Sequence, residues 1–195
     1  PTTSGSGGAD GSFPTASSVP PSQATSSAKS QSASQQYGSA FVTVPRGTAL
    51  ETPVHVLFLS SLHGEAYVTH PRVLLVLEEG ASATVVQSWI GPAGGTYLTN
   101  AVTEAVLGAG AALDLTKVQR ESREAYHVES LQVHQARGSR FTHHSISLGG
   151  RLSRNDFGSV LAGEGAECSL YGLYEVAHEQ HVDHHTTIDH AKPHG

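Results

Sequence analysis

The stretch LGAGAALDLTKV, from Leu107 to Val118, contains the pattern that decides the fold. A hydrophobic run breaks there at the step Gly110-Ala111 and resumes as an alternating run. The break recurs at spacings of 30, 28 and 27 residues, and its other copies are Gly80-Ala81, Gly138-Ser139 and Gly165-Ala166. A repeat of this length with no helical pattern inside it predicts a solenoid of strands, because each unit buries its apolar face only by stacking on the next.

Short apolar runs between the breaks are expected to form the strands. Helix is disfavoured because Gly recurs every few residues and β-branched side chains crowd the apolar positions. We therefore predict an all-β protein, a right-handed parallel β-helix, since parallel crossovers are nearly always right-handed. A β-sandwich is the alternative, but it would not explain the regular spacing. The predicted strands are Val54–Leu59, Val73–Leu77, Thr84–Ile90, Tyr97–Leu107, Ala112–Val118, Val128–Val133, Phe141–Leu148, Phe157–Leu161 and Leu170–Val176.

Composition divides the chain into two parts. Residues 1–36 are almost entirely Ser, Gly, Thr, Ala, Pro and Gln, so this Ser/Gly/Pro-rich segment is predicted to be disordered, as a linker or insertion. A transit peptide would share the Ser content but would also be rich in Arg, which this segment lacks. Residues 37–195 are assigned to the β-helix core, which we expect to be incomplete at the C-terminus. The absence of Met, even at position 1, suggests a processed or excised piece.

Charge and apolar content argue against several classes of function. The net charge of -6 disfavours a nucleic-acid partner, whose binding needs a basic surface. No apolar run approaches the ~20 residues that cross a bilayer, so we expect a soluble protein with no membrane contact. The single cysteine, Cys168, excludes an internal disulfide framework and fits a reducing compartment. Structural burial is its expected role.

Motifs for nucleotide binding and nucleophilic catalysis are incomplete in this sequence. The stretches Gly108-Ala109-Gly110 and Gly163-Glu164-Gly165 open like a dinucleotide fingerprint, but Leu113 and Cys168 stand where the third glycine belongs. A strand is expected after each stretch, whereas a phosphate cradle needs a helix N-terminus. The sequence also has no Gly-x-Ser-x-Gly elbow. We therefore predict no catalytic and no cofactor-binding residues.

A histidine cluster near the C-terminus is a candidate metal site. In an extended strand His181, Asp183 and His185 would share one outer face, with the two imidazoles and one carboxylate of a zinc or non-haem iron site. The alternative, a solvated polar face, is favoured because motif matches of this kind are often false. The pair His143-His144 is expected to supply a core histidine bonded to backbone. The charged run at residues 120–124 is expected to be a solvated loop.

Six segments resemble the SufD branch of the SufB/SufD family, and the likeness covers nearly all of residues 41–195. The detail is closest to cyanobacterial and plastid members. The segments are Glu51–Phe58 (ETPVHVLF), Thr99–Glu104 (TNAVTE), Val118–Glu121 (VQRE), Gln135–Arg140 (QARGSR), Leu148–Asp156 (LGGRLSRND) and Asp189–Gly195 (DHAKPHG).

The resemblance implies a scaffold subunit of the SUF iron–sulfur cluster assembly machinery, built on a right-handed parallel β-helix and not an enzyme. Family members pair with SufB and dock the ATPase SufC through C-terminal helices. Their complex receives sulfur from a cysteine desulfurase system and builds clusters for transfer to apo-proteins. The expected cofactor is a transient iron ion or iron–sulfur cluster on the complex, with none bound firmly by this chain. The expected compartment is the plastid stroma, with the bacterial cytoplasm as the alternative.

The sequence departs from the family by stopping at His194-Gly195, before the segment that carries most of the partner contacts. We therefore expect this piece not to bind SufC. A metal-dependent enzyme is an alternative, either a cupin-like protein using His184, His185 and His190 or a β-helix lyase. Cupins usually place a Glu after the His pair, and β-helix lyases are commonly secreted, and the sequence shows neither feature. A purely structural repeat protein is the third possibility.

Overall fold

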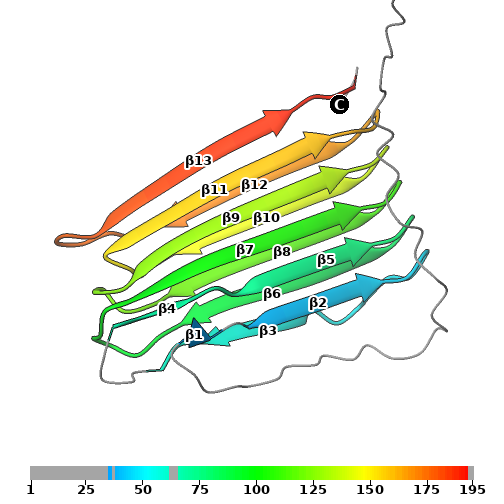
Figure 1. The fold of residues 1–195 in the computed structure, drawn as a ribbon. Coiled ribbons are helices and arrows are strands. Elements are labelled where there is room, and N and C mark those ends of the chain that lie inside the picture. Colours follow the sequence, from blue (N-terminus) through cyan, green and yellow to red (C-terminus); the bar gives the residue numbers. More distant parts are fainter. Residues whose placement is uncertain (1–34, 37, 62–65, 193–195) are drawn as a thin grey trace, which may run out of the picture.

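The computed structural model describes residues 35–36, 38–61 and 66–192, and its strands form two sheets that face each other (Figure 1). Most of the segment predicted to be disordered, residues 1–34, lies outside the described residues. Sheet A contains β1 (Gln35–Gln36), β2 (Ser39–Val44), β4 (Tyr67–Thr69), β5 (Arg72–Leu77), β7 (Tyr97–Leu107), β9 (Tyr126–Gln135), β11 (Leu152–Leu161) and β13 (His181–Asp189). Sheet B contains β3 (Val54–Leu59), β6 (Ser82–Ile90), β8 (Ala112–Arg120), β10 (Arg140–Ser147) and β12 (Glu167–Tyr174).

The strands pair in parallel, and each coil of the chain adds one layer to both sheets. In sheet B, Ser82 pairs with Ala112, Ala112 with Arg140, and Arg140 with Glu167. These offsets of 30, 28 and 27 residues equal the spacings of the Gly-Ala and Gly-Ser steps. The predicted parallel β-helix is therefore confirmed, and β13 begins a further coil.

The glycine steps form one edge of the solenoid, where the chain passes from sheet A to sheet B. Each glycine adopts the left-handed conformation that other residues reach only with strain. Successive turns are hydrogen-bonded, as when the amide of Gly80 donates to the carbonyl of Ala109 at 2.9 Å. The glycines are Gly47 (φ 66°), Gly80 (φ 66°), Gly110 (φ 66°), Gly138 (φ 63°) and Gly165 (φ 69°), of which Gly47 is a copy without the following Ala or Ser.

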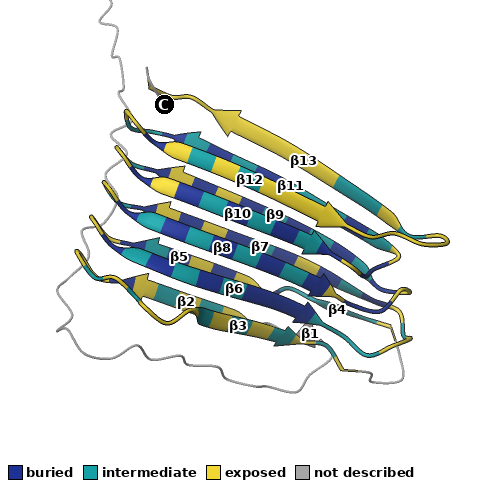
Figure 2. Ribbon diagram, turned by 180° about the vertical axis from the view of Figure 1, so that it is seen from behind, coloured by how far each residue is buried: buried dark blue, intermediate teal, exposed yellow. Residues whose placement is uncertain are grey.

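Buried residues alternate with partly or fully exposed ones along β7 and β8, as Figure 2 shows for β8. Near the glycine edge the inward residues are apolar and form the hydrophobic core, with Leu77, Leu107 and Leu113 at most 2% exposed. Toward the opposite edge many inward residues are polar, among them Gln87, Lys117 and His127, although Trp89 and Tyr97 are also buried there. The solenoid therefore has a dry half and a polar half.

The strands differ in detail from the prediction. Both β4 and β5 pair with β7, but Pro71 separates them because it cannot donate to a ladder. Strand β11 begins at Leu152, whereas its predicted start was Phe157. The prediction missed the first five residues because the polar residues 153–156 hide the alternation in the sequence. The strands β1, β2 and β4 were not predicted, and β1 (Gln35–Gln36) lies at the end of the segment predicted to be disordered. Within the described ranges, no helix is long and apolar enough to cross a membrane.

Candidate functional site

Charged side chains fill the polar half of the interior at β8, at β9 and at the turn between them. Lys117 and Gln119 lie on β8 at positions that continue the inward face of Leu115. His127 and Glu129 lie on the inward face of β9. No side chain in this set is more than 6% exposed, although charged residues are rarely buried unless they are paired. We refer to Lys117, Gln119, Glu121, His127 and Glu129 as the interior cluster.

The ammonium group of Lys117 is surrounded by three acceptors. It forms an ion pair with Oε2 of Glu129 and donates a hydrogen bond to Oδ1 of Asn155 on β11. The third acceptor is Nε2 of His127, at 3.0 Å from Nζ. Because an ammonium group can only donate, Nε2 accepts this bond, and we assign the ring proton to Nδ1.

The Glu121 carboxylate lies on the other side of the His127 ring. Its Oε2 is 2.7 Å from Nδ1 of His127, and it accepts hydrogen bonds from Thr99 at 2.6 Å and from Gln119 at 3.1 Å. Burial by itself raises the pKa of Glu121, but the adjacent His127 ring and these hydrogen bonds lower it below the ordinary value. Glu121 is therefore an ionised carboxylate in the interior.

Glu129 is the second buried carboxylate. Burial raises its pKa, but the Lys117 ammonium and the His127 ring outweigh burial and hold the pKa well below the usual range. With His127 assigned as neutral, the interior cluster contains two carboxylates and one ammonium group. It therefore carries one net negative charge.

Hydrogen bonds extend the interior cluster along the solenoid axis in both directions. Thr103 donates to Glu129 at 3.1 Å, and Gln87 donates to Thr103 at 3.4 Å. On the other side, Asn155 presents its Nδ2 to Nε2 of His184 on β13, at 3.2 Å. This polar chain joins the second coil to the last described strand.

The predicted residues His181, Asp183 and His185 lie on the outer face of β13. Oδ1 of Asp183 is 3.0 Å from Nε2 of His185, and its Oδ2 accepts a hydrogen bond from Arg154 at 3.1 Å. Among the described residues, no three His, Cys, Asp or Glu side chains converge closely enough to hold a metal ion in this conformation. Metal binding by this face would need a rearrangement, and it stays a prediction.

The enzyme alternative grouped His184 with His185 and His190. His184 lies at an inward position, bonded to Asn155, whereas the neighbouring His185 points outward to Asp183. Adjacent residues of a strand face opposite sides, so these two imidazoles are not brought to one site.

The prediction that residues 120–124 form a solvated loop is wrong for Glu121, which is buried and only 6% exposed. The inward alternation of β8 continues into the turn and carries Glu121 inside, where Gln119 and Thr99 bind it. The core histidine was predicted, and it is His143, whose Nδ1 lies 3.0 Å from the carbonyl oxygen of Leu115. Cys168 is partly buried against the hydrophobic core.

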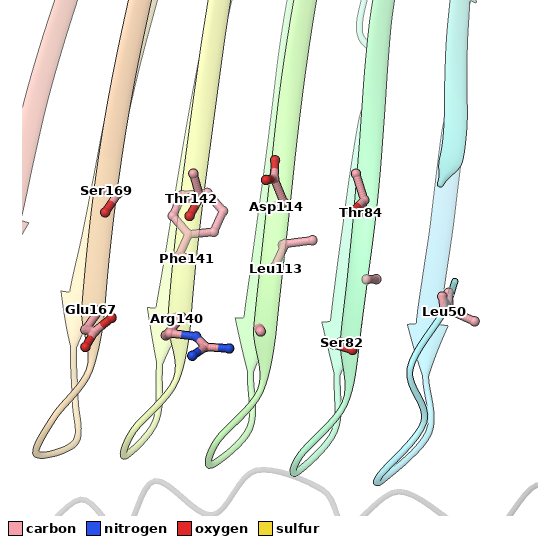
Figure 3. A pocket seen from close by; sticks show the side chains of 12 residues that line it. Leu50, Ser82, Thr84, Leu113, Asp114, Arg140, Phe141, Thr142, Glu167 and Ser169 are labelled. Carbon is pink, nitrogen blue, oxygen red and sulfur yellow. The ribbon is translucent and has the colours of Figure 1, made fainter. Parts of the chain in front are cut away.

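A shallow depression of about 310 Å³ lies on the outer face of sheet B near the glycine edge (Figure 3). Ser82, Arg140 and Glu167 form the row of side chains nearest the turns. Asp114 lies in the next row, between Thr84 and Thr142. The depression is open to solvent and has none of the dense pairing of the interior cluster. We therefore regard the interior cluster as the candidate functional site.

Comparison with known proteins gives consistent similarities. A family model described as "SUF system FeS cluster assembly, SufBD core domain" matches residues 60–195. An iron–sulfur cluster assembly SufBD family protein of Synechocystis is 30% identical over 80% of this chain and 36% of its own length. The chloroplastic protein ABCI7 of Arabidopsis thaliana is 29% identical over 75% of this chain and 32% of its own length. The iron–sulfur cluster assembly protein SufB of Bacillus subtilis is 24% identical over 80% of this chain and 33% of its own length. The chain thus spans about a third of the length of these relatives.

Proposed function

The chain belongs to the SufB/SufD family, and from this premise we propose that it acts as a scaffold subunit in SUF iron–sulfur cluster assembly. The observation that carries the proposal is the overlap between the family match and the solenoid. The matched residues 60–195 contain every coil from the second onward, including the interior cluster. A rigid stack of parallel coils suits a scaffold because each coil supports its neighbours.

The finer assignment is to the SufD branch, with a SufB-like paralogue and a SufC-like ATPase as partners. It rests on the six segments that resemble SufD, while the similar proteins are named SufBD family, SufB and ABCI7. In this proposal the chain is not an enzyme. Iron or an iron–sulfur cluster is the cargo of the complex and is held only in transit.

The proposed compartment is the plastid stroma, with the bacterial cytoplasm as the alternative. A chloroplastic relative and a cyanobacterial relative support this pair of compartments.

Pull-down of the full-length protein with a SufB-like and a SufC-like partner tests the proposal. We expect a stable three-component complex that acquires an iron–sulfur absorption spectrum when iron and a sulfur donor are supplied. A full-length protein that associates with neither partner would contradict the scaffold assignment. An unrelated β-helix protein is the control for adhesion to the affinity resin.

A further inference from the structure

The acceptors around Lys117 Nζ are also good metal ligands. His127 contributes an imidazole nitrogen, Glu129 a carboxylate oxygen and Asn155 an amide oxygen, all directed at one point. One nitrogen and two oxygen donors suit a divalent first-row transition metal. The ammonium group therefore stands where such an ion could be bound.

The surroundings of His127 are those of a metal-binding histidine. Ligating histidines usually present their other ring nitrogen to a carboxylate, which fixes the ring and its tautomer. Here Nδ1 faces Oε2 of Glu121 at 2.7 Å, while Nε2 is directed at Lys117. Glu121 is in turn held by Thr99 and Gln119.

Ser145 supplies an independent observation on β10, the strand that pairs with β8 beside Lys117. It pairs in register with Lys117, so both side chains point into the interior. Its side chain is buried, with the residue 6% exposed, and its Oγ has no hydrogen-bond partner in the structure. Buried hydroxyl groups without partners are rare. The Ser145 Oγ would be satisfied as a fourth ligand of the ion or by a hydrogen bond to a metal-bound water.

The charge balance favours a divalent ion. Glu121 and Glu129 contribute two negative charges, and Lys117 neutralises only one of them. A divalent ion in place of the ammonium group would make the interior cluster neutral, which is favoured in a desolvated interior. Zinc–ligand distances are about 2.0–2.2 Å, so each ligand would move inward by no more than about 1 Å.

We propose that His127, Glu129 and Asn155 form a divalent transition-metal site that the side chain of Lys117 occupies and thereby closes. Metal binds there when the ammonium group is withdrawn. This inference does not depend on the proposed scaffold function.

Cobalt(II) titration of the full 195-residue chain tests the site, with visible absorption as the readout. The background carries His181→Ala and His185→Ala, so that the outer face of β13 contributes no binding. Lys117→Ala in this background should gain one bound cobalt ion, with an affinity at least roughly tenfold above that of the background protein. Adding His127→Gln should remove that gain, while weak binding by surface histidines stays the same in all three proteins.

Circular dichroism accompanies the titration and reports whether Lys117→Ala is folded without metal. If the variant is unfolded, cobalt should restore its β-sheet signal, and it should fail to do so when His127→Gln is added. The proposal is overturned if Lys117→Ala binds no more cobalt than the background protein, or if its added binding survives His127→Gln. It is equally overturned if an unfolded Lys117→Ala is not rescued by cobalt.

Discussion

Lys117 is the cation that the buried Glu129 carboxylate pairs with, and both side chains are at most 4% exposed. Lys117→Met preserves the length of the side chain but leaves a buried charge unpaired. We expect the free energy of unfolding to fall by about 3–5 kcal/mol, measured by urea denaturation. The control is Arg46→Met, because the Arg46–Glu79 pair is exposed and should contribute less than about 1 kcal/mol. Equal effects of the two substitutions would show that the buried pair is not needed for stability.

His143 should make stability depend on pH. Burial lowers its pKa to about 4, so the folded protein keeps the ring neutral while the unfolded chain binds a proton at pH values below about 6.5. Stability is therefore lost as the pH falls from about 6.5 to about 4. Between about pH 7 and about pH 5 we expect a loss of about 2 kcal/mol from this residue.

The matched variant for this pH effect is His143→Phe, which keeps a ring stacked with Phe141 and Phe157. Its urea midpoint should change less with pH than that of the wild type over the same range. His184, whose pKa burial also lowers, contributes dependence of the same sign and remains in both proteins. Identical pH slopes would rule out His143 as a source of the effect.

The interior cluster was only partly accessible to sequence reasoning. Leu113 and Leu115 define the inward face of β8, and the same alternation places Lys117 and Gln119 inside. Their polarity hides this, because a Lys after two leucines is normally taken as the end of a buried run. The pairing partner Glu129 lies on another strand, so no local spacing connects it to Lys117.

At the scale of an element, the glycine edge leaves no room for added side chains at certain positions. A Cβ on Gly163 would lie 2.1 Å from the backbone nitrogen of Arg137 in the turn of the neighbouring coil. Gly163→Ala should therefore cost about 1–3 kcal/mol in urea denaturation. Gly172→Ala is the control, since a Cβ there meets nothing within 4 Å, and it should be neutral or stabilising by about 0.5 kcal/mol. A tolerated Gly163→Ala would mean that the turns do not stack as described.

The outer face of β13 yields a prediction about metal binding. Arg154 holds Asp183 and competes with any ion for its carboxylate. Anaerobic zinc or iron(II) titration should therefore show tighter binding for Arg154→Gln than for wild type. The double substitution His181→Ala and His185→Ala should abolish metal binding by this face. Unchanged binding in the double histidine variant would remove this site.

Sequence reasoning located two strands to the residue, β3 (Val54–Leu59) and β7 (Tyr97–Leu107). Tyr97–Leu107 was predicted to the residue, because it is long and ends at Gly108. The stacking of the coils was predicted from the spacing of the glycine steps, because a strand solenoid must keep its repeat in register. The start of β11 was missed because Ser153 and Asn155 face inward as part of the polar half. Polar interiors break the alternation rule on which strand prediction rests.

At the scale of the whole molecule, co-purification tests which part of the protein contacts the proposed ATPase partner. The 195-residue chain, which spans about a third of its relatives, should not retain a SufC-like ATPase on co-purification. The full-length protein under the same conditions is the control, and it should retain the ATPase. Retention by the 195-residue chain would place the ATPase contact on the β-helix coils themselves.

The two edges of the solenoid differ in how much the connecting segments vary in length. At the glycine edge, from β5 onward, sheet B resumes five residues after β5, β7 and β9 end and six residues after β11 ends, from Leu161 to Glu167. At the other edge the corresponding steps are 7, 6, 5 and 7 residues, from β6 to β7 through β12 to β13. An insertion there leaves the inward and outward faces of later strands unchanged. From β5 onward, the edge away from the glycine steps is therefore the side on which the connections of successive coils differ most in length.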